Sequence, residues 1–137
     1  MRTRGIVIGL IAVSAAGCGL FDDDGIEVGS CLNRDESADG VTYETIDCER
    51  PHDLEVVGLL DADELGADYP GETALSRWAF EACAAAFEAF VGEPYGRSLL
   101  ELDVRGPTEQ AWSDGQRGVR CSAISADGSE LSGSVAQ

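Results

Sequence analysis

Five cysteines and one histidine provide the most reactive side chains of this chain. The cysteines are Cys18, Cys31, Cys48, Cys83 and Cys121, and the histidine is His52. A cysteine can carry a lipid, close a disulfide, bind a metal ion or act as a nucleophile, and its surroundings decide which. Histidine is the residue type that most often acts as a general acid or base near neutral pH. The residues around each of these six positions favour one chemistry over the others.

The first cysteine, Cys18, ends a sequence typical of bacterial lipoprotein signals. Arg2 and Arg4 precede an uncharged, mostly apolar stretch over residues 5–13. That stretch is too short to span a bilayer but long enough for the core of a signal peptide. Small residues at 14–17 then lead into Cys18. This order resembles the lipobox, in which the cysteine sulfur receives a diacylglyceryl group and the peptide is cut just before it.

Cleavage before Cys18 would remove residues 1–17 and leave an acidic tether over residues 18–25, ahead of a domain over residues 26–135. Two acyl chains are enough for stable anchoring, because each buried CH₂ group contributes about 0.8 kcal/mol. We therefore expect a lipoprotein anchored to the extracytoplasmic face of the cell membrane. An ordinary secretory cleavage site and an uncleaved anchor are the alternatives.

The four remaining cysteines would lie in an exported domain, where an even number indicates disulfides. Three pairings are open. The predicted strands favour Cys31–Cys48, across two neighbouring strands, and Cys83–Cys121, between the main helix and a late strand. On the chain-entropy model the two closed loops stabilise the fold by about 3 and about 4 kcal/mol. Zinc is the competing interpretation, but no CxxC or HxxxH spacing is present, so we expect no metal.

His52 follows Cys48 closely in the sequence and directly precedes Asp53. A cysteine beside a histidine could act as a nucleophile, but a disulfide sulfur cannot. The preferred interpretation is that the His52 ring hydrogen-bonds the backbone in the turn after Pro51. A ligand or partner contact is the alternative, and catalysis is the least favoured one.

Trp112 and the acidic segment before the helix are two further candidates. Trp112 lies between two predicted elements and could either fill the core or form an exposed contact. Asp61, Asp63 and Glu72 match part of a calcium-binding loop, but Leu65 stands where an oxygen ligand is needed. We expect no calcium there.

The composition limits the class of partner. The chain has 137 residues, of which 26 are acidic and nine basic, and its net charge is −17. This length suits one domain, and 44% hydrophobic residues can form its core. The acidic excess excludes nucleic acid as a partner, because phosphate binding needs clustered Lys and Arg. No P-loop, dinucleotide-binding or GxSxG motif occurs, so we expect neither a cofactor nor an enzymatic activity.

The order of predicted elements indicates an α+β fold. One long helix is expected over residues 72–91, where apolar residues recur at i, i+3, i+4 and i+7, and Phe80 widens that apolar face. Strands are expected at 26–32, 41–48, 54–60, 98–105, 117–125 and 130–135, and a helical turn at 107–115. We therefore predict a mainly antiparallel sheet of about five short strands, covered by the helix and held by two disulfides.

A series of short marks along the chain resembles the septum-formation family of exported domains. The marks are Val28-Gly29-Ser30-Cys31, Cys48-Glu49-Arg50-Pro51-His52-Asp53 with Glu55-Val56, Tyr69-Pro70-Gly71, Cys83, Val91-Gly92, Pro107, Trp112, Gly115-Gln116-Arg117 and Val119-Arg120-Cys121. The resemblance implies a membrane-attached protein outside the cytoplasm, linked to formation of the division septum. It implies no established activity and no catalytic residues.

Three functions follow from these patterns, in order of preference. The first is a non-enzymatic lipoprotein that binds a protein or envelope partner in septum formation and cell division. The second is a protein that binds a small ligand or a cell-wall polymer through a cleft near His52 and Trp112. The third is a hydrolase that uses His52 with an acid such as Asp53.

Overall fold

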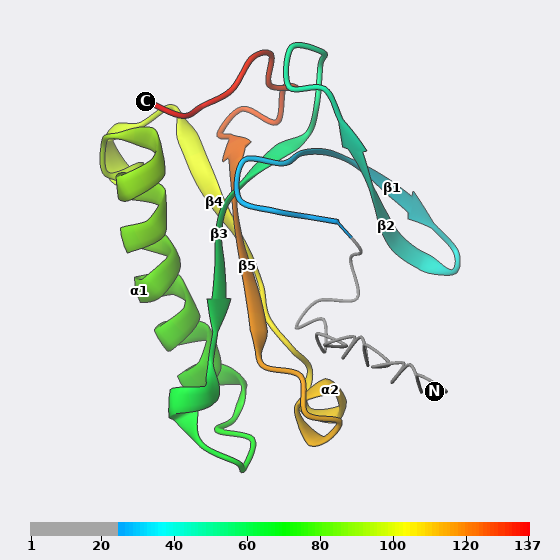
Figure 1. Cartoon of the computed structure of the whole chain (residues 1–137), viewed down its shortest axis with the longest axis vertical. Helices are drawn as coiled ribbons and strands as arrows, with labels where there is room; N and C mark the ends of the chain where they lie inside the picture. Colours follow the sequence, from blue (N-terminus) through cyan, green and yellow to red (C-terminus); the bar gives the residue numbers. More distant parts are fainter. Residues whose placement is uncertain (1–24) are drawn as a thin grey trace, which may run out of the picture.

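A five-stranded antiparallel sheet with the strand order β2-β1-β3-β5-β4 forms the frame of the molecule (Figure 1). This computed structural model describes residues 25–137, so the predicted signal peptide and the predicted lipid site at Cys18 lie outside the described residues. The strands are β1 (Cys31–Ser37), β2 (Gly40–Ile46), β3 (Leu54–Asp61), β4 (Leu100–Arg105) and β5 (Gly118–Ser125). The predicted α+β fold, with one long helix and two disulfides, is confirmed.

Strand β1 begins later than the sequence suggested. The expected strand over 26–32 is β1 at Cys31–Ser37, so the polar segment expected to be a loop is instead paired with β2. Only Cys31 and Leu32 of β1 pair with β3, and the rest of the β1–β2 hairpin extends away from the sheet (Figure 1). The side chains of this arm are mostly exposed, and the backbone ladder pairs its two strands.

The helix α1 (Glu72–Val91) covers one face of β3, β5 and β4, with the bounds that its apolar period predicts. Its buried residues recur every fourth position, and the sheet meets them with Val57, Val119, Cys121 and Ala123. Gly71 precedes the helix and Gly92 follows it, and Gly92 has a left-handed backbone with φ of 92°. Phe80 is expected on the buried face but is 42% exposed, because the face of α1 that contacts the sheet is narrower than the apolar face that the sequence predicts.

A close approach fixes α1 against β3. The register of β3 with β5 shifts between Val56 and Gly58, and Gly58 faces Ala86 of α1. A Cβ atom on Gly58 would lie 2.8 Å from the Ala86 Cβ, which is closer than two carbon atoms can pack. The absence of a side chain at Gly58 therefore sets the distance between helix and sheet.

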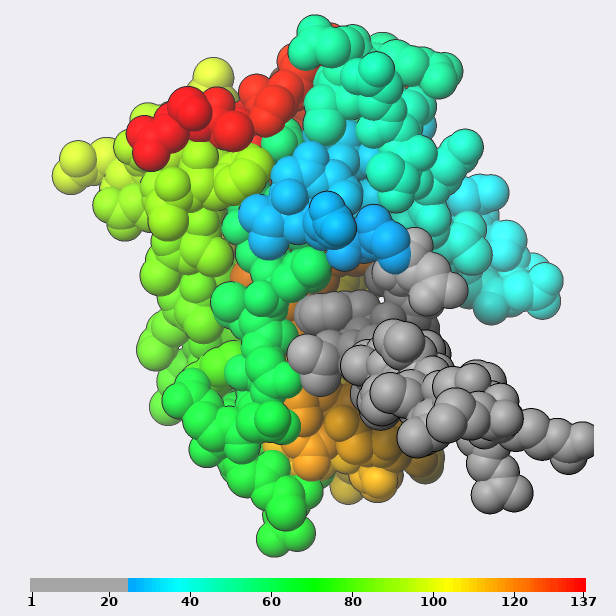
Figure 2. Space-filling view, viewed as in Figure 1, coloured from blue at the N-terminus to red at the C-terminus, as the bar shows by residue number. Residues whose placement is uncertain are grey.

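The C-terminal segment, residues 130–137, is hydrogen-bonded both to the turn between β2 and β3 and to the end of α1. Instead of the expected strand over 130–135, it forms a single antiparallel bridge between His52 and Leu131. Gly133 donates to the Cys48 carbonyl at 2.8 Å and Gln137 donates to the Phe90 carbonyl at 3.1 Å. Figure 2 shows this segment in red across the molecule, lying against the end of α1. None of the helices within residues 25–137 is long and apolar enough to cross a membrane.

Candidate functional site

The four cysteines of the described region form the two disulfides that the sequence favoured. Cys31 at the start of β1 is bonded to Cys48 after β2, with a Cα–Cα distance of 5.3 Å. Cys83 in α1 is bonded to Cys121 in β5, also at 5.3 Å. Cys83 and Cys121 are fully buried in the core between helix and sheet, whereas Cys48 is only partly buried. The two disulfides therefore differ in their access to solvent.

His52 is fully buried and its ring is fixed by the main chain. Its Nδ1 atom lies 2.7 Å from the Arg50 carbonyl oxygen, and a carbonyl can only accept, so Nδ1 carries the proton. This confirms the interpretation of a ring that hydrogen-bonds the backbone beside Pro51. The His52 backbone is also bonded to Leu131 in both directions, at 3.0 and 2.7 Å. The Nε2 atom is buried and has no hydrogen-bond partner among the described residues.

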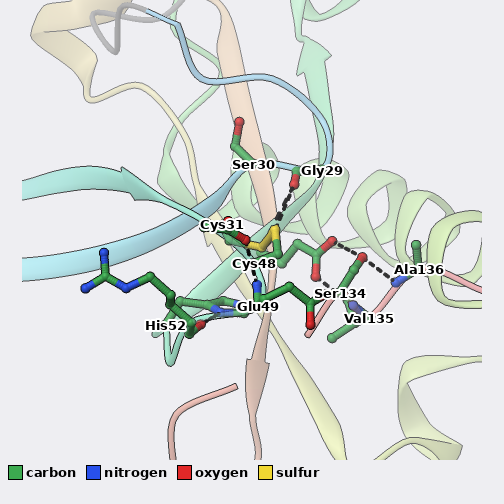
Figure 3. The surroundings of a disulfide bond; sticks show 12 residues. Gly29, Ser30, Cys31, Cys48, Glu49, His52, Ser134, Val135 and Ala136 are labelled. Atoms are coloured by element: carbon green, nitrogen blue, oxygen red, sulfur yellow. Dashed lines mark hydrogen bonds between the residues drawn. A yellow bond between two sulfur atoms is a disulfide. The ribbon is translucent and has the colours of Figure 1, made fainter. Parts of the chain in front are cut away.

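Glu55 is a buried carboxylate that sequence reasoning missed. It is fully buried in β3, where Ser134 Oγ donates to Oε1 at 2.6 Å and Val135 N–H donates to Oε2 at 2.7 Å (Figure 3). A charged residue inside an otherwise apolar strand was the available signal, because such a residue needs partners when the strand is buried. Glu55 therefore holds the C-terminal segment against the sheet.

The side chains of Cys31, His52 and Glu55 come together at this end of the sheet. Their potential ligand atoms all lie within 4.8 Å of one another, and all three residues are buried. We refer to the Cys31–Cys48 disulfide, His52 and Glu55 as the buried polar cluster. Sulfur, imidazole nitrogen and carboxylate oxygen are the donor types that zinc-like ions prefer.

Trp112 fills the core at the opposite end of the molecule. It lies in the short helix α2 (Glu109–Ser113) and is 2% exposed. Its Nε1 donates to the Ala67 carbonyl at 3.0 Å, and the Arg117 guanidinium carbon lies 3.8 Å from the ring centroid. Tyr69 contacts the ring edge-on at a centroid distance of 6.0 Å. Trp112 thus joins the loop before α1 to α2 and is buried, as the interpretation of Trp112 as a core residue predicts.

A cleft of about 760 Å³ lies between α1 and the segment that follows β4. Leu75, Ala79 and Phe80 line it from the helix, and Val104 and Pro107 line it from the other side. Glu72 and Glu109 contribute a carboxylate on each side. We call this the α1–β4 cleft.

Neither His52 nor Trp112 lines the α1–β4 cleft or the smaller polar cleft beside Arg34 and Asp53. Both side chains are buried, so a contact with a ligand or partner through either one needs the surrounding segments to move. Tyr69 connects the two regions, because it packs on Trp112 and also lines the α1–β4 cleft. The α1–β4 cleft is the larger of these two clefts, at about 760 Å³ against about 330 Å³.

Comparison with known protein families shows which family this chain belongs to. The family model for septum formation matches residues 28–137. The chain belongs to the septum-formation family. No curated protein and no solved structure gives a significant match. Both the buried polar cluster and the α1–β4 cleft lie inside the matched septum-formation domain.

Proposed function

We propose that this septum-formation protein is a non-enzymatic binding module, attached to the extracytoplasmic face of the membrane through Cys18. In this proposal the α1–β4 cleft holds an extended segment of a protein that acts at the division septum. The family relationship supports the link to septum formation. The observation that carries the binding role is the cleft itself, which combines an exposed aromatic side chain with an apolar floor.

The helix side of the cleft suits an apolar anchor. Glu72, Ser76 and Phe80 are exposed and stand four residues apart, so they follow one line along α1. Leu75 and Ala79 are buried between them and form the floor. Exposed aromatic residues in a concave setting are the kind that carry most of the energy of protein interfaces.

The sheet side of the cleft suits an extended backbone. Val104 belongs to β4, the last strand of the sheet, and no strand within residues 25–137 pairs with the outer edge of β4. An edge strand offers backbone N–H and C=O groups that an extended partner segment can extend into a further strand. Alternate side chains of such a segment would then point toward the cleft.

The negative charge of the cleft and of the whole chain favours a partner segment with basic side chains. Glu72 and Glu109 are exposed on the two sides of the cleft, and the whole chain has a net charge of −17. A segment that alternates apolar residues with Lys or Arg is complementary to this lining. Phosphate-rich polymers and other anions would be repelled, which favours a protein partner over an anionic cell-wall polymer.

We propose a non-enzymatic role because the cysteines and the histidine within residues 25–137 already have structural partners. Cys31 and Cys48 are bonded to each other, and the His52 ring is buried against Arg50. A disulfide sulfur is no nucleophile, and a buried ring lies out of reach of a substrate in the cleft.

The test compares the cellular position of two double variants of the full-length protein, followed by fluorescence in living cells of the source bacterium. Phe80→Ala with Glu109→Arg alters the cleft. Leu99→Ala with Glu88→Arg changes an exposed apolar and an exposed acidic residue outside it. We expect the unaltered protein and the control to be enriched at division sites, and the cleft variant to lose at least about 80% of that enrichment.

Thermal unfolding of both purified variants first establishes that they fold. A folded cleft variant that keeps its septal enrichment would overturn the assignment of the cleft. Uniform envelope fluorescence of the unaltered protein, together with normal division after deletion, would remove the septal role.

A further inference from the structure

The buried polar cluster brings four metal-ligand residues to one place from three parts of the chain. Cys31 and Glu55 are paired across β1 and β3, so their side chains share one face of the sheet. Cys48 is bonded to Cys31, and His52 lies two residues before the start of β3. Figure 3 shows the disulfide near His52, with Ser134 and Val135 of the C-terminal segment to the right of the disulfide.

Three of the four ligand atoms lie near enough to one another for a metal site, and Cys48 is joined to them through its bond to Cys31. The ligand atoms of Cys31, His52 and Glu55 lie within 4.8 Å of one another, and the Cys48 sulfur is 2.06 Å from that of Cys31. Four ligand atoms at 2.0–2.3 Å from a zinc ion are separated by about 3.3–3.8 Å. A contraction of up to about 1 Å among these three atoms would match that spacing. The Cys48 sulfur must in addition separate from Cys31 and turn toward the other ligands.

The partners of His52 and Glu55 are those that support metal ligands. His52 donates its Nδ1 proton to the Arg50 carbonyl, which leaves Nε2 with a lone pair and no partner among the described residues, although it is fully buried. Glu55 accepts from Ser134 and Val135, and each of its oxygens retains a further lone pair. In metal sites a backbone carbonyl typically fixes the ligating histidine in this way, and the ligating carboxylates are themselves hydrogen-bonded.

The disulfide prevents this set from acting as a full site, because a disulfide sulfur is a poor ligand compared with a thiolate. We propose that reduction of the Cys31–Cys48 disulfide converts the buried polar cluster into a four-ligand site for a divalent ion of the zinc type. Cys31, Cys48, His52 and Glu55 are the ligands.

The reducing co-reactant is a dithiol. Its thiolate attacks the Cys48 sulfur, which is the more accessible of the two, and the Cys31 thiolate leaves. The second thiol of the reductant then displaces Cys48, so the protein gains two electrons and two protons while the dithiol becomes a disulfide. Binding of the metal ion releases the two thiol protons.

The second disulfide provides an internal comparison. Cys83 and Cys121 are both fully buried, and the group of His, Cys, Asp and Glu ligand atoms found among residues 25–137 is that of Cys31, His52 and Glu55, not one around this disulfide. A reductant has no direct access to either sulfur, and no such group of ligands within residues 25–137 surrounds this disulfide to complete a metal site. We expect this disulfide to stay closed under conditions that open Cys31–Cys48.

The test uses the full-length protein in detergent, with Co²⁺ as a spectroscopic probe and Zn²⁺ as the competing ion. A phosphine reductant opens the accessible disulfide, and an untreated sample remains oxidised. We expect one Co²⁺ per reduced chain, with the visible bands of a tetrahedral ion and a thiolate charge-transfer band. Affinity for Zn²⁺ should be at least 100-fold higher in the reduced than in the oxidised protein.

Peptide mapping after alkylation identifies the ligands without any substitution. Zn²⁺ should protect Cys31 and Cys48 from alkylation, while Cys83 and Cys121 remain disulfide-bonded. Glu55→Gln and His52→Gln should each weaken Zn²⁺ binding at least tenfold, and Glu81→Gln, at an exposed carboxylate of α1, should not. Equal metal binding in both redox states, protection of Cys83 or Cys121 instead, or Co²⁺ spectra without thiolate bands would overturn the proposal. None of these results depends on a septal partner.

Discussion

His52, Glu55 and Trp112 are buried side chains that form hydrogen bonds. The His52 ring is bonded to the nearby Arg50 carbonyl, whereas the Glu55 and Trp112 side chains join segments that are distant in the sequence. The patterns around His52 and Trp112 indicated a backbone hydrogen bond and a core position, and the structure confirms both. Glu55 could not be found in the same way, because its partners Ser134 and Val135 lie 79 and 80 residues further along the chain. A charged residue within an apolar strand indicates that Glu55 needs partners, but the local sequence does not show where in the chain those partners lie.

Asp127 gives the clearest prediction at this scale. The Ser125 hydroxyl, the Ser129 hydroxyl and the Ser129 backbone N–H all donate to it, and these bonds lower its pKa from 3.8 to about 2. Because the pKa is lower in the folded state, the ionised carboxylate stabilises this turn above about pH 4, and the effect is lost as the pH falls toward 2.

Ser125→Ala removes the strongest of these donors and should raise the pKa of Asp127 toward 3.8. Carboxyl carbon chemical shifts, followed by NMR as a function of pH, measure this. Ser113→Ala serves as the control, because the Ser113 hydroxyl bonds only the carbonyls of its own helix. An unchanged Asp127 titration in Ser125→Ala would show that the hydroxyl does not hold the carboxylate.

The helix could be predicted with its bounds, whereas two of the strands could not. Helix α1 shows the apolar period over its whole length and ends at Gly92. Strand β1 lacks an apolar alternation after Leu32, because most of the hairpin that it forms with β2 leaves the sheet, and the hairpin contacts a core cluster through Tyr43 of β2. The expected strand over 130–135 does not form, because its contacts are of different kinds: Leu131 forms one β-bridge with His52, Gly133 donates to the Cys48 carbonyl, and Val135 donates to the Glu55 carboxylate.

The packing of α1 on β3 yields a prediction for Gly58. Gly58→Ala places a methyl group 2.8 Å from Ala86 Cβ and should destabilise the protein by about 1–3 kcal/mol, because the helix must move. Ala86→Gly alone should cost about 1 kcal/mol through helix propensity. Urea unfolding of the full-length protein measures both.

The double variant distinguishes a steric cause from a general weakening of the strand. If the clash is the cause, Gly58→Ala with Ala86→Gly should be less destabilised than the sum of the two single variants. Strict additivity would mean that the close approach does not limit the packing.

At the scale of the whole molecule, the α1–β4 cleft, which is the proposed binding surface, shares no lining residue with the buried polar cluster. Residues within 69–80, most of them in α1, line one side of the cleft, and residues within 104–109 line the other. The Cys83–Cys121 disulfide holds α1 against the sheet. The sequence indicated a binding module and an acidic surface but placed the cleft near His52 and Trp112. Its position depends on how the helix lies across the sheet, which no local pattern reveals.

In vivo photo-crosslinking from position 80 tests most directly whether the cleft holds a septal partner. A photoreactive phenylalanine replaces Phe80 in the cleft or Leu99, which is 89% exposed and does not line the cleft. We predict a crosslink from position 80 to an extended, Lys- or Arg-containing segment of a protein located at the division site. We also predict that Glu109→Arg reduces this crosslink at least fivefold and that position 99 gives none. Equal crosslinking from both positions, or captured segments only from proteins absent from the septum, would contradict the account.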